Sequence, residues 1–138
     1  MDLRPTARSL VVCEEVVPDR VDPNRLSLLR VIHSIKPARD SQLPLLQQRL
    51  CVFAQVTEGR GNGLIRVGFR FADSDRLVAY TRTRSIAFPG NSPLLVQGIH
   101  FQALNLVIRD PGLYWVQLRY NDDVLTQTPL LVRPVPKT

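Results

Sequence analysis

The sequence predicts an all-β protein, a single antiparallel β-sandwich of about eight strands with an immunoglobulin-like or C2-like shape. Three observations lead to this prediction. Apolar and polar residues alternate with a period of two in several segments. These segments are rich in β-branched and aromatic residues. Turn-forming sequences separate them at intervals of about 10 to 20 residues. The length of 138 residues fits one domain, residues 1–138, and we expect its ordered core to span residues 7–132.

The first half of the chain contains three candidate strands, one of them ambiguous. They are Ala7–Val17, Arg25–Ile35 and Leu45–Thr57. The segment "NRLSLLRVIHSI" also permits a short helix, because Asn24 is a possible N-cap. Leu28, Leu29 and Ile32 have the spacing of one helical face. The β-branched end of the segment favours a strand. We therefore expect at most one short helix.

The second half of the chain alternates more clearly. Its candidate strands are 64–72, 78–88, Leu95–Ile108, 113–120 and Val124–Val132. The parity of the apolar residues predicts that Phe69 and Tyr114 belong to the core. Within Leu95–Ile108 the apolar parity changes near Ala103, which predicts a β-bulge or a bend. The turns "GRGNG" and "DSD" supply the conformations that tight connections need.

Composition indicates a cytoplasmic protein. No apolar stretch is long enough for a membrane helix, and the first residues do not have the pattern of a secretory signal. The two cysteines, Cys13 and Cys51, lie in apolar runs without a metal-binding spacing, so we expect buried free thiols. The net charge of +6 raises the question of nucleic acid, but the basic residues are scattered rather than clustered.

The sequence contains no motif for catalysis. Its two histidines, His33 and His100, have no nucleophile elbow beside them, and "GRGNG" precedes a strand rather than a phosphate-binding helix. Together with Cys13 and Cys51 they would just suffice for a zinc site, although their spacing does not support one. We therefore expect no enzyme activity, no metal and no cofactor.

A calcium site remains as an alternative hypothesis. Successive loops of antiparallel strands alternate between the two ends of a sandwich, which would bring several acidic residues to one end. These are Asp19, Asp22, Glu58, Asp122 and Asp123. Calcium needs six to eight oxygen ligands, several of them from carboxylates. Aspartates are also common turn residues, so the sequence does not decide between the two roles.

One candidate interaction face emerges from the arginines. Arg66 and Arg70 share a side of one strand, Arg82 and Arg84 share a side of the next, and the "DSD" turn should make the two strands neighbours. On another strand, Arg119 alternates outward together with Trp115. The predicted face therefore consists of Arg66, Arg70, Arg82, Arg84, Trp115 and Arg119. Guanidinium groups beside an indole suit a protein partner or a phosphate-bearing ligand.

The order of the segments resembles a known group of proteins. The opening "LVVCEEVVPD", the central "PLLQQRLCVFAQVTEGRGNGLIRVGFRF" and the final "DPGLYWVQLRYNDDVLTQTPLLV" are similar to a bacterial family of small β-rich proteins with a domain of unknown function. The resemblance covers about residues 7–132. It implies a bacterial cytoplasmic protein and carries over neither an activity nor a site.

We therefore expect a non-enzymatic protein-interaction module that binds a protein partner or a second copy of itself. One alternative is binding of nucleic acid or a phosphate ligand through the arginine-rich face. A second alternative is an enzyme of unknown class. The sequence leaves the partner, the strand order and the oligomeric state open.

Overall fold

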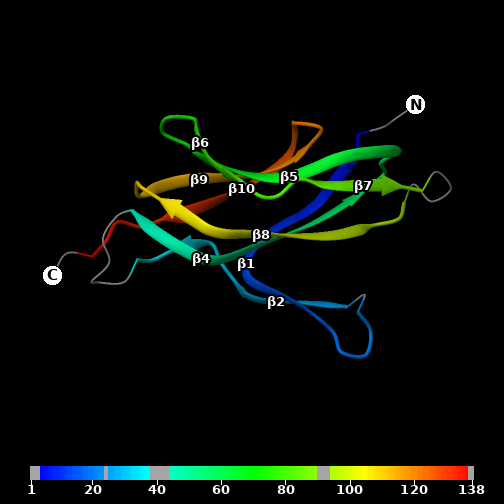
Figure 1. Ribbon diagram of the computed structural model, residues 1–138, viewed down its shortest axis with the longest axis horizontal. Coiled ribbons are helices and arrows are strands. Elements are labelled where there is room, and N and C mark those ends of the chain that lie inside the picture. The colour runs from blue at the N-terminus through cyan, green and yellow to red at the C-terminus, as the bar shows by residue number, and fades with distance from the viewer. Residues whose placement is uncertain (1–3, 24, 38–43, 90–93, 137–138) are drawn as a thin grey trace.

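A computed structural model describes residues 4–23, 25–37, 44–89 and 94–136. The protein is all-β, as the alternating patterns predict, and these residues contain no helix (Figure 1). They form ten strands: β1 (Thr6–Pro18), β2 (Leu26–Val31), β3 (Ser34–Ile35), β4 (Leu45–Thr57), β5 (Gly61–Phe71), β6 (Arg76–Tyr80), β7 (Arg84–Phe88), β8 (Gln97–Ile108), β9 (Gly112–Tyr120) and β10 (Asp123–Val132). Within the described ranges, nothing forms a helix that could cross a membrane.

The strands form two sheets that enclose one core. One sheet has the order β2-β1-β4-β8, and the other has the order β3-β10-β9-β5-β6, with β7 also paired to β5. Figure 1 shows them as two layers, with the β1–β2 hairpin extending away from both. The described pairs are antiparallel except for β3 with β10. Buried side chains from both sheets meet between the layers, and the predicted core residues Phe69 and Tyr114 are among them.

Two of the eight predicted strands are each divided in two. The predicted strand Arg25–Ile35 becomes β2 in one sheet and β3 in the other. At its centre, Arg30 has a left-handed φ of 55°. The alternative of a helix here is wrong, because Leu26–Val31 is extended and pairs with β1. Asn24, the possible N-cap, lies outside the described residues.

The second division separates β6 from β7. Both strands pair with β5 on the same side, β6 with its C-terminal half and β7 with its N-terminal half. Thr81 lies at the break. Its N–H donates to the Val67 carbonyl at 2.8 Å, and its hydroxyl accepts a hydrogen bond from the Val67 N–H at 3.0 Å. A side-chain oxygen thus replaces a backbone partner, and the chain can change direction without leaving Val67 unsatisfied.

The predicted irregularity near Ala103 involves no inserted residue. The described pairs Leu50–Ala103, Arg49–Leu104 and Gln47–Leu106 all keep one register. Nevertheless Ala103 and Leu106 are both buried, although they lie an odd number of residues apart, and Leu104 is 66% exposed. The strand therefore changes the side that it buries while its pairing with β4 continues, and the predicted bulge is absent from these pairs.

The two cysteines lie directly opposite each other in β1 and β4. Both are buried and both are free thiols, as the sequence predicts. Burial is the main factor that raises the pKa of each thiol, and for Cys13 the neighbouring Cys51 adds to the effect. The pair therefore remains in the neutral thiol form at physiological pH.

Candidate functional site

Four of the six predicted site residues lie together on the outer face of the second sheet. Arg66 in β5 is paired with Arg119 in β9, and Arg70 is paired with Trp115. All four are half-buried. They alternate with core residues such as Phe69, which is why they point away from the core. We call Arg66, Arg70, Trp115 and Arg119 the outer arginine face.

Two of the three arginines on the outer arginine face, Arg66 and Arg70, have their charge matched by a carboxylate within the protein. Arg66 forms an ion pair with Asp122 at 2.8 Å, and its guanidinium lies 3.5 Å from the centre of the Tyr80 ring. Arg70 lies 3.6 Å from the Asp75 carboxylate and donates to the Asp75 carbonyl. These contacts occupy guanidinium N–H groups with which a new anionic ligand would also have to form hydrogen bonds.

Among the described residues Arg119 forms no ion pair and is held by neutral acceptors, while its buried Nε has no hydrogen-bond partner. Its two terminal nitrogens donate to the Asp122 carbonyl at 3.0 Å and to the Gln117 side chain at 2.9 Å. Tyr80 lies near it because Gly68, its partner in β5, has no side chain. A Cβ at Gly68 would lie 2.8 Å from a Tyr80 ring carbon, closer than real contacts allow. The glycine thus makes room for the ring between Arg66 and Arg119.

Arg82 and Arg84 lie elsewhere, so the predicted convergence of four guanidinium groups is wrong. The "DSD" turn does pair β5 with β6, as expected. Beyond the break at Thr81, however, Arg84 is paired with the core residue Ile65 and its side chain therefore lies on the inner side of the sheet. There its guanidinium donates to the His100 carbonyl of β8 at 2.9 Å.

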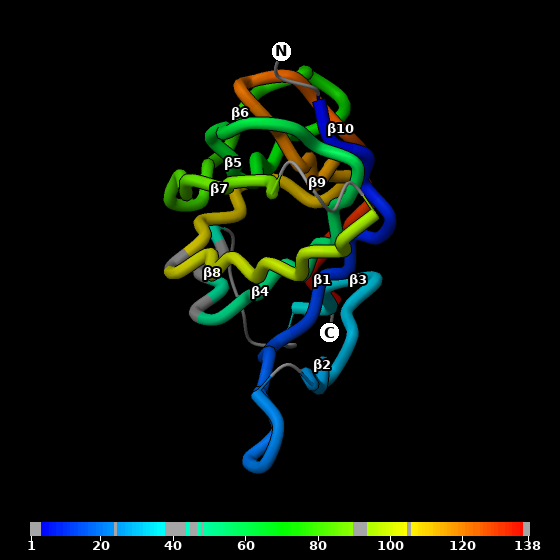
Figure 2. Tube along the Cα trace, turned by 90° about the vertical axis from the view of Figure 1, so that its right-hand side faces the viewer, coloured from blue at the N-terminus to red at the C-terminus, as the bar shows by residue number. Residues whose placement is uncertain are grey.

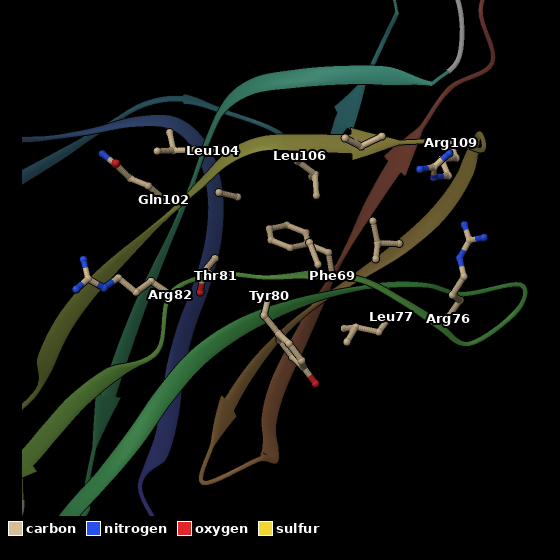
Figure 3. A pocket seen from close by; sticks show the side chains of 14 residues that line it. Phe69, Arg76, Leu77, Tyr80, Thr81, Arg82, Gln102, Leu104, Leu106 and Arg109 are labelled. Atoms are coloured by element: carbon tan, nitrogen blue, oxygen red, sulfur yellow. The ribbon is translucent and has the colours of Figure 1, made fainter.

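A groove lies between the edges of the two sheets, where β6 faces β8. It has a volume of about 550 Å³. Figure 3 shows Phe69 and Leu106 between the two edges, Arg82 at one end, and Arg76 with Arg109 at the other. Apolar side chains form most of its walls. They are Phe69, Leu77, Val78, Ala79, Ala103, Leu104, Leu106 and Val107.

The groove is cationic. Arg76, Arg82 and Arg109 line it, and the described lining residues include no carboxylate. Arg76 forms an ion pair with Asp110 at 3.2 Å. In the described part of the chain, Arg82 and Arg109 form no ion pair. A smaller hollow of about 430 Å³ continues the groove along β8 past Arg82 toward Arg84.

The two sheet edges are joined at one end of this side of the molecule and not at the other. Near β7, Arg84 donates to the His100 carbonyl, and Gln97 donates to the Ala87 carbonyl at 2.9 Å. Figure 2 shows β7 and β8 on the same side of the molecule. Among the described residues, no comparable bond connects β6 with β8. The groove therefore occupies the end at which both edges are free.

Sequence reasoning missed most of the groove residues. Leu77 and Leu104 are exposed to 39% and 66%, and both lie on sheet edges. The parity change near Ala103 indicated that Leu104 is exposed, and an exposed leucine on an edge strand is a candidate for a binding surface. The positions of Arg76 and Arg109 follow from the strand order, which has no local signal.

The acidic residues of the calcium hypothesis do not gather. Asp22 lies 3.6 Å from Arg25, and Asp122 holds Arg66 on the outer arginine face. Among the described residues, no three histidine, cysteine or acidic side chains lie close enough to bind a metal ion. His33 and His100 are both exposed, and their backbone carbonyls accept hydrogen bonds from Leu131 and Arg84.

Comparison with known proteins identifies a family without a known role. A family described as "Family of unknown function (DUF6941)" matches residues 8–133. The curated proteins give no match.

Several solved structures resemble the fold at low identity. An alkylpurine DNA glycosylase from Pseudomonas fluorescens, bound to DNA with an abasic site analogue, shares 14% identity and a TM-score of 0.45 over 74% of this chain and 28% of its own. A β-glucosidase from Listeria innocua in complex with glucose shares 14% identity and a TM-score of 0.49 over 95% and 16%. A β-D-glucoside glucohydrolase from Trichoderma reesei shares 10% identity and a TM-score of 0.49 over 94% and 19%. This chain thus corresponds to a small part of each, and the resemblance carries no functional argument.

Proposed function

This chain belongs to the DUF6941 family, and we propose that it is a non-enzymatic protein-interaction module that binds its partner in the groove between β6 and β8. One observation supports the proposal most. An apolar hollow lies between two free sheet edges, and Arg82 and Arg109 on its rim have no acidic partner among the described residues. Exposed apolar surface surrounded by unmatched charge is typical of protein-binding sites.

The groove suits a protein better than a nucleic acid. Binding of single-stranded nucleic acid usually depends on aromatic rings that are free to stack with bases. Phe69 in the groove is buried, and the ring of Tyr80 is covered by Arg66. The alternative of phosphate binding at the outer arginine face is also less favoured, because a phosphate would have to displace carboxylates that already hold Arg66 and Arg70.

The proposal includes a location in the bacterial cytoplasm. The free, buried thiols of Cys13 and Cys51 fit a reducing compartment, since proteins of oxidising compartments commonly contain disulfides. An enzymatic role would require a nucleophile or acid beside a group that activates it. In the described part of the chain, His33 and His100 are exposed and belong to no cluster of three histidine, cysteine or acidic side chains.

The proposal is tested by photo-crosslinking in the source cells. A photoreactive amino acid replaces Leu104 in the groove or, as a control, Val21, which is 91% exposed in the β1–β2 hairpin. Each is combined with one of two double substitutions that change net charge equally. Arg82→Glu with Arg109→Glu reverses the rim of the groove, and Arg20→Glu with Arg60→Glu reverses two exposed arginines that do not line it.

We expect a discrete protein adduct from position 104 and none from position 21. The adduct should disappear with the rim reversal and persist with the control reversal. Absence of any protein adduct at position 104, or an adduct equally strong with both reversals, would overturn the proposal. An adduct that nuclease digests would support the nucleic-acid alternative instead.

A further inference from the structure

We infer that the groove binds an extended acidic peptide segment, which adds as a further strand to the free edge of β8. The inference rests on the proposed function and names the class of partner and the mode of binding. Three features of the described residues support it: the directions of the backbone groups of β8, the apolar walls beside them, and the positions of the unmatched arginines.

The backbone of β8 offers a free edge. Its described neighbour in the sheet is β4 alone, and the strand is twelve residues long. The carbonyl of His100 accepts a hydrogen bond from Arg84, so it is directed away from β4. In an antiparallel ladder the backbone groups alternate between the two sides of a strand. Because the register with β4 is unshifted, Gln102 and Leu104 direct their N–H and carbonyl groups to the same open side.

These outward groups lack the usual protection. Proteins normally shield long edge strands with charges, prolines, bulges or a covering loop. At the β7 end, Arg84 and Gln97 provide such protection. Along the groove, no described residue forms a hydrogen bond with the backbone of Gln102 or Leu104 across the open side. An extended chain beside β8 would satisfy these groups and continue the sheet.

The walls of the groove define the side chains of such a peptide. An added strand turns alternate side chains toward the core side and toward solvent. On the core side they would meet Phe69 and Leu106, and along the edge they would pass Leu77 and Leu104. Small β-branched residues at alternate positions match these surfaces. The opposite wall, formed by β6 and the break that follows it, runs from Arg76 to Arg82 and corresponds to about seven residues of extended chain.

The arginines at the two ends of the groove predict that the peptide has acidic residues at both of its ends. Arg82 lies at one end of the groove, and Arg109 lies at the other beside Arg76, whose charge is matched by Asp110 (Figure 3). The described lining residues include no carboxylate that would repel an acidic ligand. The whole chain carries a net charge of +6, which also favours encounter with an acidic partner. The inferred ligand thus has acidic residues flanking a short β-branched centre.

The test uses a synthetic octapeptide, DEVTVTDE, with blocked termini. Its control, KKVTVTKK, keeps the β-branched centre and reverses the charge. Binding is followed by NMR on the ¹⁵N-labelled protein. We expect DEVTVTDE to shift the amide signals of Gln102 and Leu104, while KKVTVTKK leaves them unchanged. The rim reversal Arg82→Glu with Arg109→Glu should raise the Kd about tenfold or more, whereas Arg20→Glu with Arg60→Glu should change it less than about threefold.

Backbone methylation separates strand addition from a contact made by side chains alone. Two versions of the octapeptide are methylated on alternate backbone nitrogens, one on the odd residues and the other on the even residues. Only one alternate set of N–H groups faces a paired strand. One version should therefore lose binding while the other keeps it. Equal binding by both versions would overturn strand addition.

The remaining outcomes each overturn part of the inference. Failure of DEVTVTDE to shift these signals at millimolar concentration, or equal binding by KKVTVTKK or by an oligothymidylate, would overturn the acidic-peptide inference. Concentration-dependent broadening of the β8 signals without peptide, with a dimer on a sizing column, would replace it by pairing with a second copy. In each case, a persisting adduct at position 104 would leave the proposed function intact and reject only the binding mode.

Discussion

The outer arginine face and the groove use the same residue type in opposite ways. On the outer face, Arg66 and Arg70 are half-buried, and each is held by an acidic partner. In the groove, Arg82 and Arg109 are exposed, and the described residues give them no ion pair. The two regions meet at β5 and β6, which are paired, and Arg70 in β5 and Arg76 in β6 are only six residues apart in the sequence.

The difference shows that the role of an arginine depends on whether an acidic side chain of the protein already neutralises its charge. A matched guanidinium mainly stabilises the fold, because its hydrogen bonds and its contact with Tyr80 are lost when it is removed. An unmatched guanidinium contributes little to folding and remains available to a ligand. Substitutions in the two regions should therefore separate stability from binding.

The largest effect is expected at the floor of the groove. Phe69 is 1% exposed and belongs to both the groove and the core, so Phe69→Ala should lower the free energy of unfolding by about 3–5 kcal/mol. Leu104→Ala, on the rim, should lower it by no more than about 0.5 kcal/mol, because the side chain is 66% exposed. Urea denaturation measures both. An equal loss of unfolding free energy in the two variants would mean that Phe69 is not packed more tightly than the exposed Leu104.

A smaller effect should distinguish the two sets of arginines directly. Arg66→Ala removes an ion pair and a cation–π contact from a half-buried site, and should cost about 1–2 kcal/mol of stability. Arg82→Ala should cost no more than about 0.5 kcal/mol. If Arg82→Ala destabilised the protein as much as Arg66→Ala, its charge would be matched, and the contrast between the two regions would fail.

The sequence predicts the outer arginine face better than it predicts the groove, for a physical reason. Side-chain alternation within a strand is local, so the shared side of Arg66 and Arg70 follows from a period of two. The "DSD" turn is local as well, and the pairing of β5 with β6 is confirmed. The break at Thr81 depends on a hydroxyl that meets Val67, fourteen residues earlier in the chain. Arg84 therefore lies on the inner side of the sheet, whereas alternation along one continuous strand predicts the outer side that Tyr80 occupies.

The groove depends on long-range order that has no local signature. It exists because β6 and β8, from different sheets, are both edge strands on the same side of the molecule. Many strand orders are compatible with the same alternating segments, so the sequence left the order open. The division of two predicted strands, which raises the number from eight to ten, arises in the same way, since β3 leaves one sheet to pair with β10 in the other.

A further effect should sharpen the contrast between the closed and open ends of this side of the molecule. Arg84→Ala with Gln97→Ala removes the two bonds that join β7 and β8, and should cost about 1 kcal/mol of stability. The amides near His100 should then exchange with solvent faster, while those of Gln102 change little because no described bond protects them across the groove. Hydrogen exchange measured by NMR tests this, and equal acceleration at both positions would contradict it.

The smallest effect is expected at the thiols, which lie apart from both regions. Cys13 and Cys51 are buried in β1 and β4, and neither lines the groove. Iodoacetamide should therefore label them slowly at neutral pH in the parent protein and equally slowly in Arg82→Ala. Rapid labelling of the native parent would contradict their burial.

The raised pKa of each thiol also makes stability depend on pH in a defined direction. The neutral thiols suit the buried site, so their contribution is complete below the ordinary thiol pKa of 9.0. Above that pH the unfolded chain ionises first, and the contribution is lost as the pH rises through the raised pKa of the folded state. A Cys13→Ala, Cys51→Ala variant should lose less stability than the parent between about pH 8 and pH 10.5. Parallel pH curves for the two proteins in urea denaturation would show that burial does not hold these thiols neutral.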